Sequence, residues 1–276
     1  MFEEMWTREE GCREIIETAW DPLNYNPDMS IQKRLQSCKD HLQDWNYKVF
    51  GNVTKVLKQK QRRLQYLEEL NLLHELAEEI QGLKKGINEM LFREEVMWNQ
   101  RSRALWIKCG DRNTKFFHAT ANNRQRKNRI EGISNSEGRW REDRMEVENV
   151  ILEYFTEIYS TSYPTEFDAS LNAVGSRVSE EMNVELLREF REEEVWRALM
   201  QMHPTKSPGP DGMSPIFFQK YWDVVGPQVI QSVMNILRTG TMPNGLNDTY
   251  ICLIPKVKSP QKISEYRPIS LCKCNL

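Results

Sequence analysis

The stretch Lys206-Ser207-Pro208-Gly209-Pro210-Asp211-Gly212 contains two prolines and two glycines within its last five residues. Such a segment cannot lie inside a helix or a central strand, because proline fixes φ and removes a hydrogen-bond donor, while glycine permits positive φ. The stretch therefore predicts a rigid, exposed turn whose backbone amides are partly unpaired. By composition alone, a turn of this kind is a connector between two ordered elements.

Three further stretches follow this turn in order: Gln219-Lys220-Tyr221-Trp222, Leu253-Ile254-Pro255-Lys256 and Tyr266-Arg267-Pro268-Ile269-Ser270-Leu271. Together with residues 206–218 (KSPGPDGMSPIFF), they resemble the opening of the reverse transcriptase domain of LINE-type (non-LTR) retrotransposons, most like plant copies. Upstream, Trp106, Gly110-Asp111 and residues 113–118 (NTKFFH) resemble the segment that links the family's endonuclease to its polymerase.

The resemblance implies RNA-directed DNA polymerisation by the complete family protein, which holds magnesium on aspartates of its palm. Family spacing places those aspartates beyond Ser270, and the sequence has no Asp-Asp pair. We interpret Asp211 as a turn-capping residue. The chain is therefore expected to have no catalytic residue and to bind no metal or other cofactor alone. Both ends look cut relative to the family, which suggests a fragment of a decayed or mis-spliced retroelement.

Three cations follow from the resemblance as candidate binding residues. Arg267 is the best match for a group that binds the triphosphate of the incoming nucleotide, and Lys256 is the second. A guanidinium binds phosphate through paired hydrogen bonds, and an ammonium adds a point charge. Lys206 would lie on the template side of the fingers, next to turn amides that could seat a phosphate. Without the family, these residues would be ordinary exposed cations.

The net charge of −2 conceals a strong segregation of charge. Residues 101–130 hold nine Lys/Arg against one Asp, whereas residues 137–196 hold sixteen Asp/Glu against six Arg. Cations neutralise phosphates and release counterions, so the basic segment favours RNA or an RNA/DNA hybrid as partner. The candidate contacts are Arg112, Lys115, Arg124, Arg126, Lys127 and Arg129. We interpret Trp106, Phe116 and Phe117 as core anchors; stacking on unpaired bases is the alternative.

Composition bounds the class of protein. Hydrophobic residues make up 39% and charged residues 28%, and the mean hydropathy is −0.68, which favours elongated helices with much solvated surface. Six scattered cysteines are typical of reduced thiols in an intracellular protein. No apolar run approaches the roughly 20 residues of a membrane span, so we expect a soluble protein with no membrane partner. The basic stretch 125–129 also resembles a nuclear-localisation patch, and the family's life cycle implies a nuclear location.

Hydrophobic periodicity predicts a mainly α protein with a small β component: an elongated helical hairpin followed by a partial α+β fingers region. Helices over 31–49 and 53–90 would form the hairpin around Phe50-Gly51-Asn52, or else one bent helix. Further predictions are a β-hairpin at 130–140, a helix at 142–159, a linker at 160–178, helices within 179–202 and 214–239 (interrupted at Gly226-Pro227), and strands at 249–255 and 268–271. The corresponding domains are 1–130, a helical linker region with a basic C-terminal part; 131–178, a hairpin, helix and linker; and 179–276, a truncated fingers region.

Three functions remain open on the sequence. The first is a truncated reverse transcriptase segment limited to nucleic-acid binding. The second is an autonomous helical nucleic-acid-binding protein that reuses the same scaffold. The third is a helical scaffold that recruits protein partners. A salt-dependent affinity for RNA separates the first two from the third. The sequence does not indicate an oligomeric state.

Overall fold

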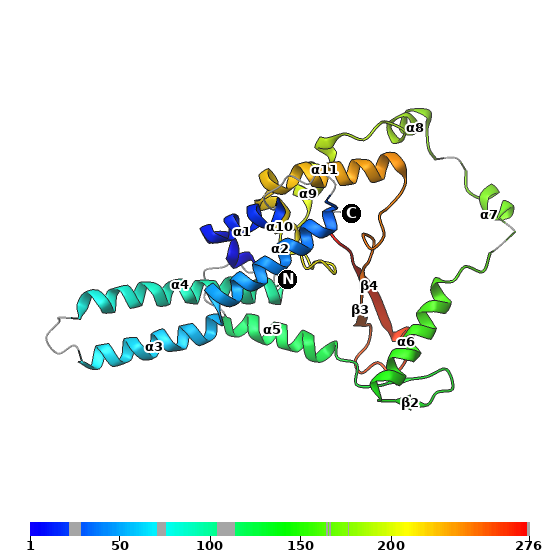
Figure 1. The fold of residues 1–276 in the computed structure, drawn as a ribbon. Helices are drawn as coiled ribbons and strands as arrows, with labels where there is room; N and C mark the ends of the chain where they lie inside the picture. The colour runs from blue at the N-terminus through cyan, green and yellow to red at the C-terminus, as the bar shows by residue number, and fades with distance from the viewer. Residues whose placement is uncertain are drawn as a thin grey trace. The chain divides into compact units, whose positions relative to one another are not determined.

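The computed structural model describes residues 1–21, 29–70, 76–103, 114–163, 165, 167–175 and 177–274. As predicted, this part of the chain is mainly α-helical with two small antiparallel sheets (Figure 1). It divides into two compact units that interleave along the sequence. The helical unit comprises Met1–Arg126, Glu192–Tyr250 and Leu271–Leu276, and the mixed unit comprises Lys127–Arg191 and Ile251–Ser270.

The helical unit is built from short and long helices drawn from its three segments. They are η1 (Glu4–Arg8), α1 (Glu10–Trp20), α2 (Ile31–Trp45), the π-helical turn η2 (Asn46–Phe50), α3 (Val53–Leu70), α4 (Ala77–Ser102), α5 (Thr114–Lys127), α9 (Glu192–Gln201), α10 (Pro215–Lys220) and α11 (Trp222–Thr239). The last residue of α5, Lys127, is assigned to the mixed unit.

Helix α2 forms as its sequence pattern predicts. The apolar side chains of its inner face are all buried: Ile31, Leu35, Cys38, Leu42 and Trp45. The side chain of Ser30 accepts a hydrogen bond from the backbone N–H of Lys33, so Ser30 caps the first turn of the helix. The break at Gly51 is also confirmed, since this residue has a φ of +56° that favours glycine.

The position of the helical hairpin differs from the prediction. Its two arms are α3 and α4, which run side by side (Figure 1), rather than α2 and the helix that follows it. Ion pairs connect the arms, Arg63 to Glu79 at 3.1 Å and Lys84 to Glu68 at 2.8 Å. The predicted helix over 53–90 ends at Leu70 because its second half packs on its first, while α2 packs on α1.

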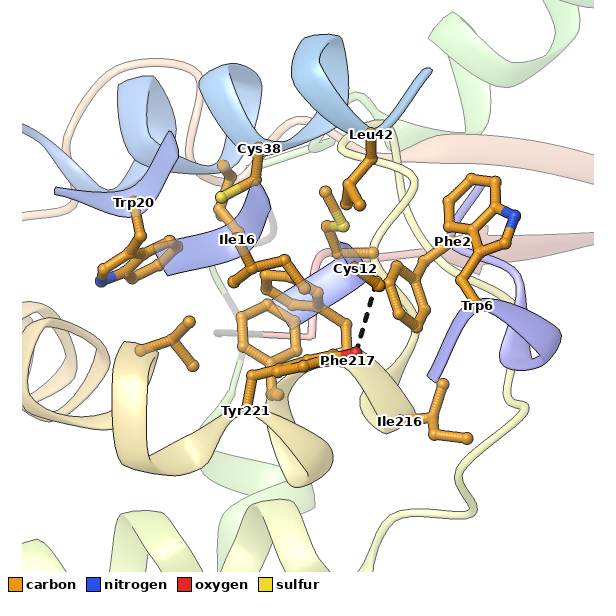
Figure 2. Close-up of a cluster of buried hydrophobic side chains, with 14 of the residues drawn as sticks. Phe2, Trp6, Cys12, Ile16, Trp20, Cys38, Leu42, Ile216, Phe217 and Tyr221 are labelled. Atoms are coloured by element: carbon orange, nitrogen blue, oxygen red, sulfur yellow. Dashed lines mark hydrogen bonds between the residues drawn. The ribbon is translucent and has the colours of Figure 1, made fainter. Parts of the chain in front are cut away.

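The core of the helical unit joins segments that are far apart in sequence (Figure 2). Phe217 of α10 is fully buried, with ring centroids 5.4 Å from Phe2, 6.4 Å from Trp20 and 6.0 Å from Tyr221. Aromatic pairs at such spacings add to the free energy gained by removing the rings from water. The N-terminal segment and α10 therefore complete one core.

The stretch 208–212 is a turn, but the predicted exposure is wrong. Gly209 is buried, and its neighbours in the turn are half-buried. The backbone N–H of Phe2 donates to the carbonyl of Gly212 at 2.8 Å, and the N–H of Gly212 donates to the carbonyl of Gly209 at 3.0 Å. The N-terminal segment covers the turn, which sequence periodicity cannot show. Asp211 caps it as predicted, accepting from the N–H of Met213 at 3.1 Å.

The helical block over 214–239 is interrupted at Tyr221, where α10 ends and α11 begins, and not at Gly226-Pro227. Pro227 lies inside α11. The burial of Val225 and Val229 on either side offsets the hydrogen bond that proline cannot donate. A Cβ on Gly226 would lie 2.8 Å from the Trp222 ring, so glycine lets this indole lie against the helix.

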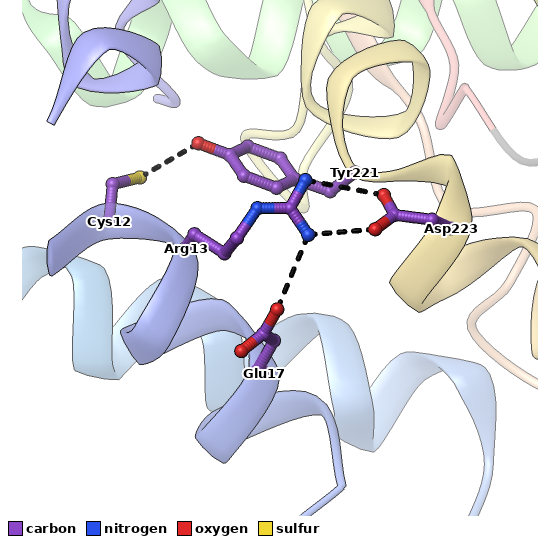
Figure 3. A network of polar contacts seen from close by, with 5 residues as sticks. All are labelled: Cys12, Arg13, Glu17, Tyr221 and Asp223. Atoms are coloured by element: carbon purple, nitrogen blue, oxygen red, sulfur yellow. Dashed lines mark hydrogen bonds and ion pairs between the residues drawn. The ribbon is translucent and has the colours of Figure 1, made fainter. Parts of the chain in front are cut away.

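A polar network joins α1 to the start of α11 (Figure 3). The Arg13 guanidinium pairs with both oxygens of Asp223, at 2.7 and 3.4 Å, and also contacts Glu17 at 3.3 Å. The Tyr221 hydroxyl donates to the Sγ of Cys12 at 3.3 Å. Burial raises the pKa of the Cys12 thiol to about 11, so this sulfur stays protonated and unreactive.

The mixed unit contains the smaller elements. They are β1 (Ile133–Ser134), β2 (Trp140–Arg141), α6 (Arg144–Tyr159), α7 (Asp168–Asn172), α8 (Glu180–Leu186), η3 (Ile263–Glu265) and the antiparallel strands β3 (Tyr250–Pro255) and β4 (Tyr266–Leu271). The first residue of β3 and the last residue of β4 are assigned to the helical unit. The predicted hairpin is confirmed, with Ile133 opposite Arg141 and Ser134 opposite Trp140. Asp143 caps α6 by accepting from the N–H of Met145 at 2.9 Å.

A second, small core holds the mixed unit together. Ile133, Phe155, Ile263 and Tyr266 bury their side chains against one another. The backbone N–H of Ser134 donates to the carbonyl of Gln261 at 2.8 Å, which ties the first hairpin to the loop before β4. The stretch predicted as a linker at 160–178 includes the short helix α7, and its described side chains are exposed.

Candidate nucleic-acid interface

Helix α5 supplies most of the predicted nucleic-acid contacts and contains no acidic residue. Phe117 is fully buried, so it anchors the helix, which confirms the interpretation of this residue as a core anchor. Phe116 is half-buried beside it, with ring centroids 5.8 Å apart. Trp106 and the candidate Arg112 lie outside the described residues.

Arg124 has a structural contact that the sequence did not indicate. It lies seven residues after Phe117, on the same face of α5. Its Nη1 donates to the backbone carbonyl of Ser102 at 2.6 Å, and this carbonyl belongs to the last turn of α4. A cation there donates to a carbonyl at the end of the helix and interacts favourably with the helix dipole. Arg124 therefore docks α5 against α4.

The other described candidates in this region are exposed. Lys115 and Arg126 lie eleven residues apart, which places them on one face of α5. Lys127 ends the helix and Arg129 follows it. Within the described ranges, no carboxylate forms an ion pair with any of these four side chains, in contrast to cations such as Lys48 and Arg144. A phosphate backbone can therefore approach them without displacing a protein partner.

An aromatic stack lies where α4 meets α5. The rings of Trp98 and His118 have centroids 3.6 Å apart and an angle of 35° between their planes. The Arg101 guanidinium lies 5.4 Å from the centroid of the Trp98 ring. These three residues belong to the helical unit, as do Lys115 and Arg126. Trp98 and His118 are therefore the aromatic pair beside the exposed cations of α5, whereas Phe117 is buried in the core and Phe116 is half-buried.

Lys206 is exposed just before the buried turn. Its backbone N–H donates to the carbonyl of His203 at 3.1 Å, which fixes the backbone there. The turn amides offer little as a phosphate seat, because the Gly212 and Met213 N–H groups already donate to Gly209 and Asp211. Burial raises the pKa of Asp211, while the hydrogen bond from the N–H of Met213 lowers it.

The structure brings Lys256 and Arg267 to the same end of the β3–β4 hairpin. The backbone N–H of Lys256 donates to the carbonyl of Glu265 at 2.8 Å, one residue before β4 begins. Its Nζ donates to the carbonyl of Ser264 at 2.7 Å, while Arg267 is exposed on β4. Both residues belong to the mixed unit and Lys206 to the helical unit.

The connection between β3 and β4 holds two further exposed cations, Lys258 and Lys262, which were not predicted as binding residues. The repeated lysines at 256, 258 and 262, between two predicted strands, could have indicated a basic turn. Glu265 is the carboxylate of this turn, and it accepts from the N–H groups of Gln261 and Lys262, which lowers its pKa. The turn thus presents four cations, counting Lys256 and Arg267.

The sequence is similar to that of a transposon protein. The Transposon TX1 uncharacterized 149 kDa protein of Xenopus laevis is 26% identical over 199 residues. This alignment covers 66% of the chain and 15% of the Xenopus protein, so the chain spans a small part of its relative. No family model matches the sequence. The similarity supports a transposon-related origin for the chain.

The described residues form neither a metal-ligand cluster nor a helix that could span a membrane. Among them, no group of three or more His, Cys, Asp or Glu side chains is arranged to hold a metal ion. No helix in the same part of the chain combines the length and apolar character needed to cross a membrane. The cysteines that the structure describes, Cys12, Cys38, Cys252, Cys272 and Cys274, are free thiols.

Proposed function

We propose that this chain is the nucleic-acid-binding part of a LINE-type reverse transcriptase and binds RNA or an RNA/DNA hybrid through α5. The observation that carries the proposal is the group of exposed cations Lys115, Arg126, Lys127 and Arg129, for which no ion-pair partner is found among the described residues. The similarity to a transposon protein and the order of the reverse transcriptase-like stretches support it.

In this proposal, the β3–β4 hairpin end is a second phosphate-binding surface. Arg267 and Lys256 would contact the triphosphate of a nucleotide, as their motif positions imply, and Lys258 and Lys262 add positive charge beside them. The role of Lys206 is a contact to the template strand. A nuclear location belongs to the same proposal, because the family copies its RNA at the chromosomal target.

The salt dependence of RNA affinity tests the role of α5. For single strands, the logarithm of the binding constant falls with the logarithm of salt concentration by about 0.7 per neutralised phosphate. Replacing Lys115, Arg126, Lys127 and Arg129 with Ala should lower the affinity for a short single-stranded RNA and reduce this slope by about 3.

A matched control removes four exposed cations that already have carboxylate partners: Lys48, Arg63, Lys84 and Arg144. This variant loses the same charge and should retain most of the slope. Equal slopes in the two variants would mean that net charge alone, and not α5, drives binding. The double substitution of Lys256 and Arg267 with Ala tests the second surface by the same measurement, and Lys206→Ala tests the template contact separately.

An exposed apolar stripe favours a second candidate function, a scaffold that recruits protein partners. Met145, Leu152 and Tyr159 lie seven residues apart along α6, and between 62% and 65% of each side chain is exposed. A helix surface of this kind can dock onto another protein. If RNA binding is absent at low salt, and Leu152→Glu abolishes association with a partner, the scaffold function replaces the first proposal.

A further inference from the structure

A pocket of about 450 Å³ lies in the helical unit between the N-terminal segment, the start of α3 and the end of α4. Its volume is within the range of about 300–1,000 Å³ that is usual for small-ligand sites. Met5, Trp6, Val53 and Met97 contribute buried apolar side chains, while Gln43 and Asn52 are exposed. The pocket thus combines an apolar surface with a polar, accessible edge.

Two side chains that line this pocket carry buried polar atoms for which the described residues supply no hydrogen-bond partner: Oε2 of Glu3 and Nε1 of Trp98. The side chain of Glu3 is only 10% exposed. An unpaired buried carboxylate oxygen or indole N–H costs free energy, so each favours a ligand that completes its hydrogen bonding. One atom is an acceptor and the other is a donor.

Arg101 brings these two residues together. Its Nη2 contacts Oε1 of Glu3 at 3.0 Å, and its guanidinium lies over the Trp98 ring. The backbone around Glu3 is held in place by Gln100, whose Oε1 accepts from the N–H of Glu4 at 2.9 Å and whose Nε2 donates to the carbonyl of Phe2 at 3.0 Å. The pocket is therefore held in shape by α4.

We propose that this pocket binds a guanine base. Guanine presents two neighbouring N–H donors on one edge and the acceptors O6 and N7 on the other. The donors fit the Glu3 carboxylate, which has one unpartnered oxygen and one shared with Arg101. The acceptors fit the indole N–H of Trp98 and the Arg101 guanidinium. Adenine has a single donor group, so it would leave one oxygen of the Glu3 carboxylate without a donor from the base.

This inference rests on the proposed function, because the guanine would be a base of the RNA that α5 binds. Trp98 stacks on His118 of α5, and α5 carries Lys115 and Arg126 within the same unit. Single-stranded RNA is read in general by stacking and by hydrogen bonds to the edges of unpaired bases. The pocket would add base selectivity to a backbone contact that has none.

Calorimetric titration of the full chain with the four ribonucleoside 5′-monophosphates tests the pocket independently of α5. GMP should bind at least about ten-fold more tightly than AMP, CMP or UMP, the ratio expected for one hydrogen bond to a charged group. Glu3→Gln should remove this preference, and Trp98→Phe should weaken GMP binding by several-fold while keeping a ring. Glu10→Gln and Trp196→Phe, at exposed positions, are the matched controls and should leave the preference unchanged.

The outcomes separate the two proposals. Equal binding of the four nucleotides, binding of none, or a GMP preference that survives in both Glu3→Gln and Trp98→Phe would overturn the guanine pocket. Lys115→Ala with Arg126→Ala should lower RNA affinity and leave GMP affinity intact. A chain that prefers GMP and binds no RNA would overturn the α5 proposal while the pocket stands, and salt-dependent RNA binding without GMP preference would do the reverse.

Discussion

Helices α10 and α8 are both short and rich in apolar residues, yet their surroundings are opposite. In α10, Ile216, Phe217 and Phe218 are buried, whereas no residue of α8 is buried and Met182, Val184 and Leu186 are exposed. α8 begins with a capping serine, because Ser179 accepts a hydrogen bond from the N–H of Met182, so its sequence favours a helix locally. Helices of this length are marginal on their own in water, so packing decides how firmly each is held. Within the helical unit, α10 packs on the N-terminal segment through Phe217 and Phe2, whereas the side chains of α8 are exposed within the mixed unit.

The largest effect should come from removing the centre of the α10 contact. Phe217→Ala deletes a fully buried ring and should cost about 3–5 kcal/mol of the free energy of unfolding of the helical unit. Leu186→Ala on α8 is the matched control and should change stability by no more than about 0.5 kcal/mol. Urea unfolding followed by tryptophan fluorescence measures both. Similar costs for the two variants would refute the contrast between the helices.

An intermediate effect is expected at the buried turn. A Cβ on Gly209 would lie 2.6 Å from the backbone carbonyl carbon of Cys272, so Gly209→Ala forces the backbone around Cys272 to move. The expected loss is about 1–3 kcal/mol, the usual cost of overpacking. Gly175→Ala is the control, because a Cβ there meets nothing within 4 Å.

Thiol reactivity gives a second readout of the same substitution. Burial raises the pKa of Cys274 to about 12, so this thiol should react slowly with a thiol reagent in the wild-type chain. Gly209→Ala should accelerate its modification by displacing the C-terminal strand end from the turn. If the rate and the stability both stay at wild-type values, the turn is not packed as described.

The smallest effect should come from the exposed ion pair between α1 and α11. Arg13 and Asp223 are both well exposed, so a double-mutant cycle with Arg13→Ala and Asp223→Asn should give a coupling of about 0.2–1 kcal/mol. Hydrogen bonding to Arg13 lowers the pKa of Asp223 below its usual value of 3.8. The contribution of the Asp223 carboxylate to the free energy of unfolding is therefore present above pH 3.8 and is lost as the pH falls through the lowered pKa. A coupling that persists unchanged at pH 2 would contradict this account.

Local patterns in the sequence predicted the elements well where contacts are also local. The start of the helix predicted over 31–49, the β-hairpin predicted at 130–140 and the helix predicted at 142–159 are all confirmed. The patterns failed where the partner is remote in sequence. Nothing near Gly212 indicates that Phe2 will donate to its carbonyl, so the turn was predicted to be exposed. Similarly, the stripe over 53–90 did not show that its second half packs on its first.

The candidate site could be predicted only in part. Basic composition identified Lys115, Arg126, Lys127 and Arg129, and the structure leaves their side chains exposed. It did not separate Arg124, whose contact with the Ser102 carbonyl depends on how α5 meets α4. Glu3 and Trp98 carry no motif at all, since their unpartnered atoms become apparent only when η1 and α4 are placed together.

The contact between Phe2 and Phe217 also has a consequence for folding during synthesis of the chain. These rings are in contact although their positions in the sequence are 215 apart. A ribosome that adds roughly 5–20 residues per second needs on the order of 10–40 seconds to reach the second ring after the first. During this interval Phe2, Trp6 and Trp20 lack the α10 side of their core and expose apolar surface. Production of this protein therefore depends on how well the nascent chain is protected before α10 is made.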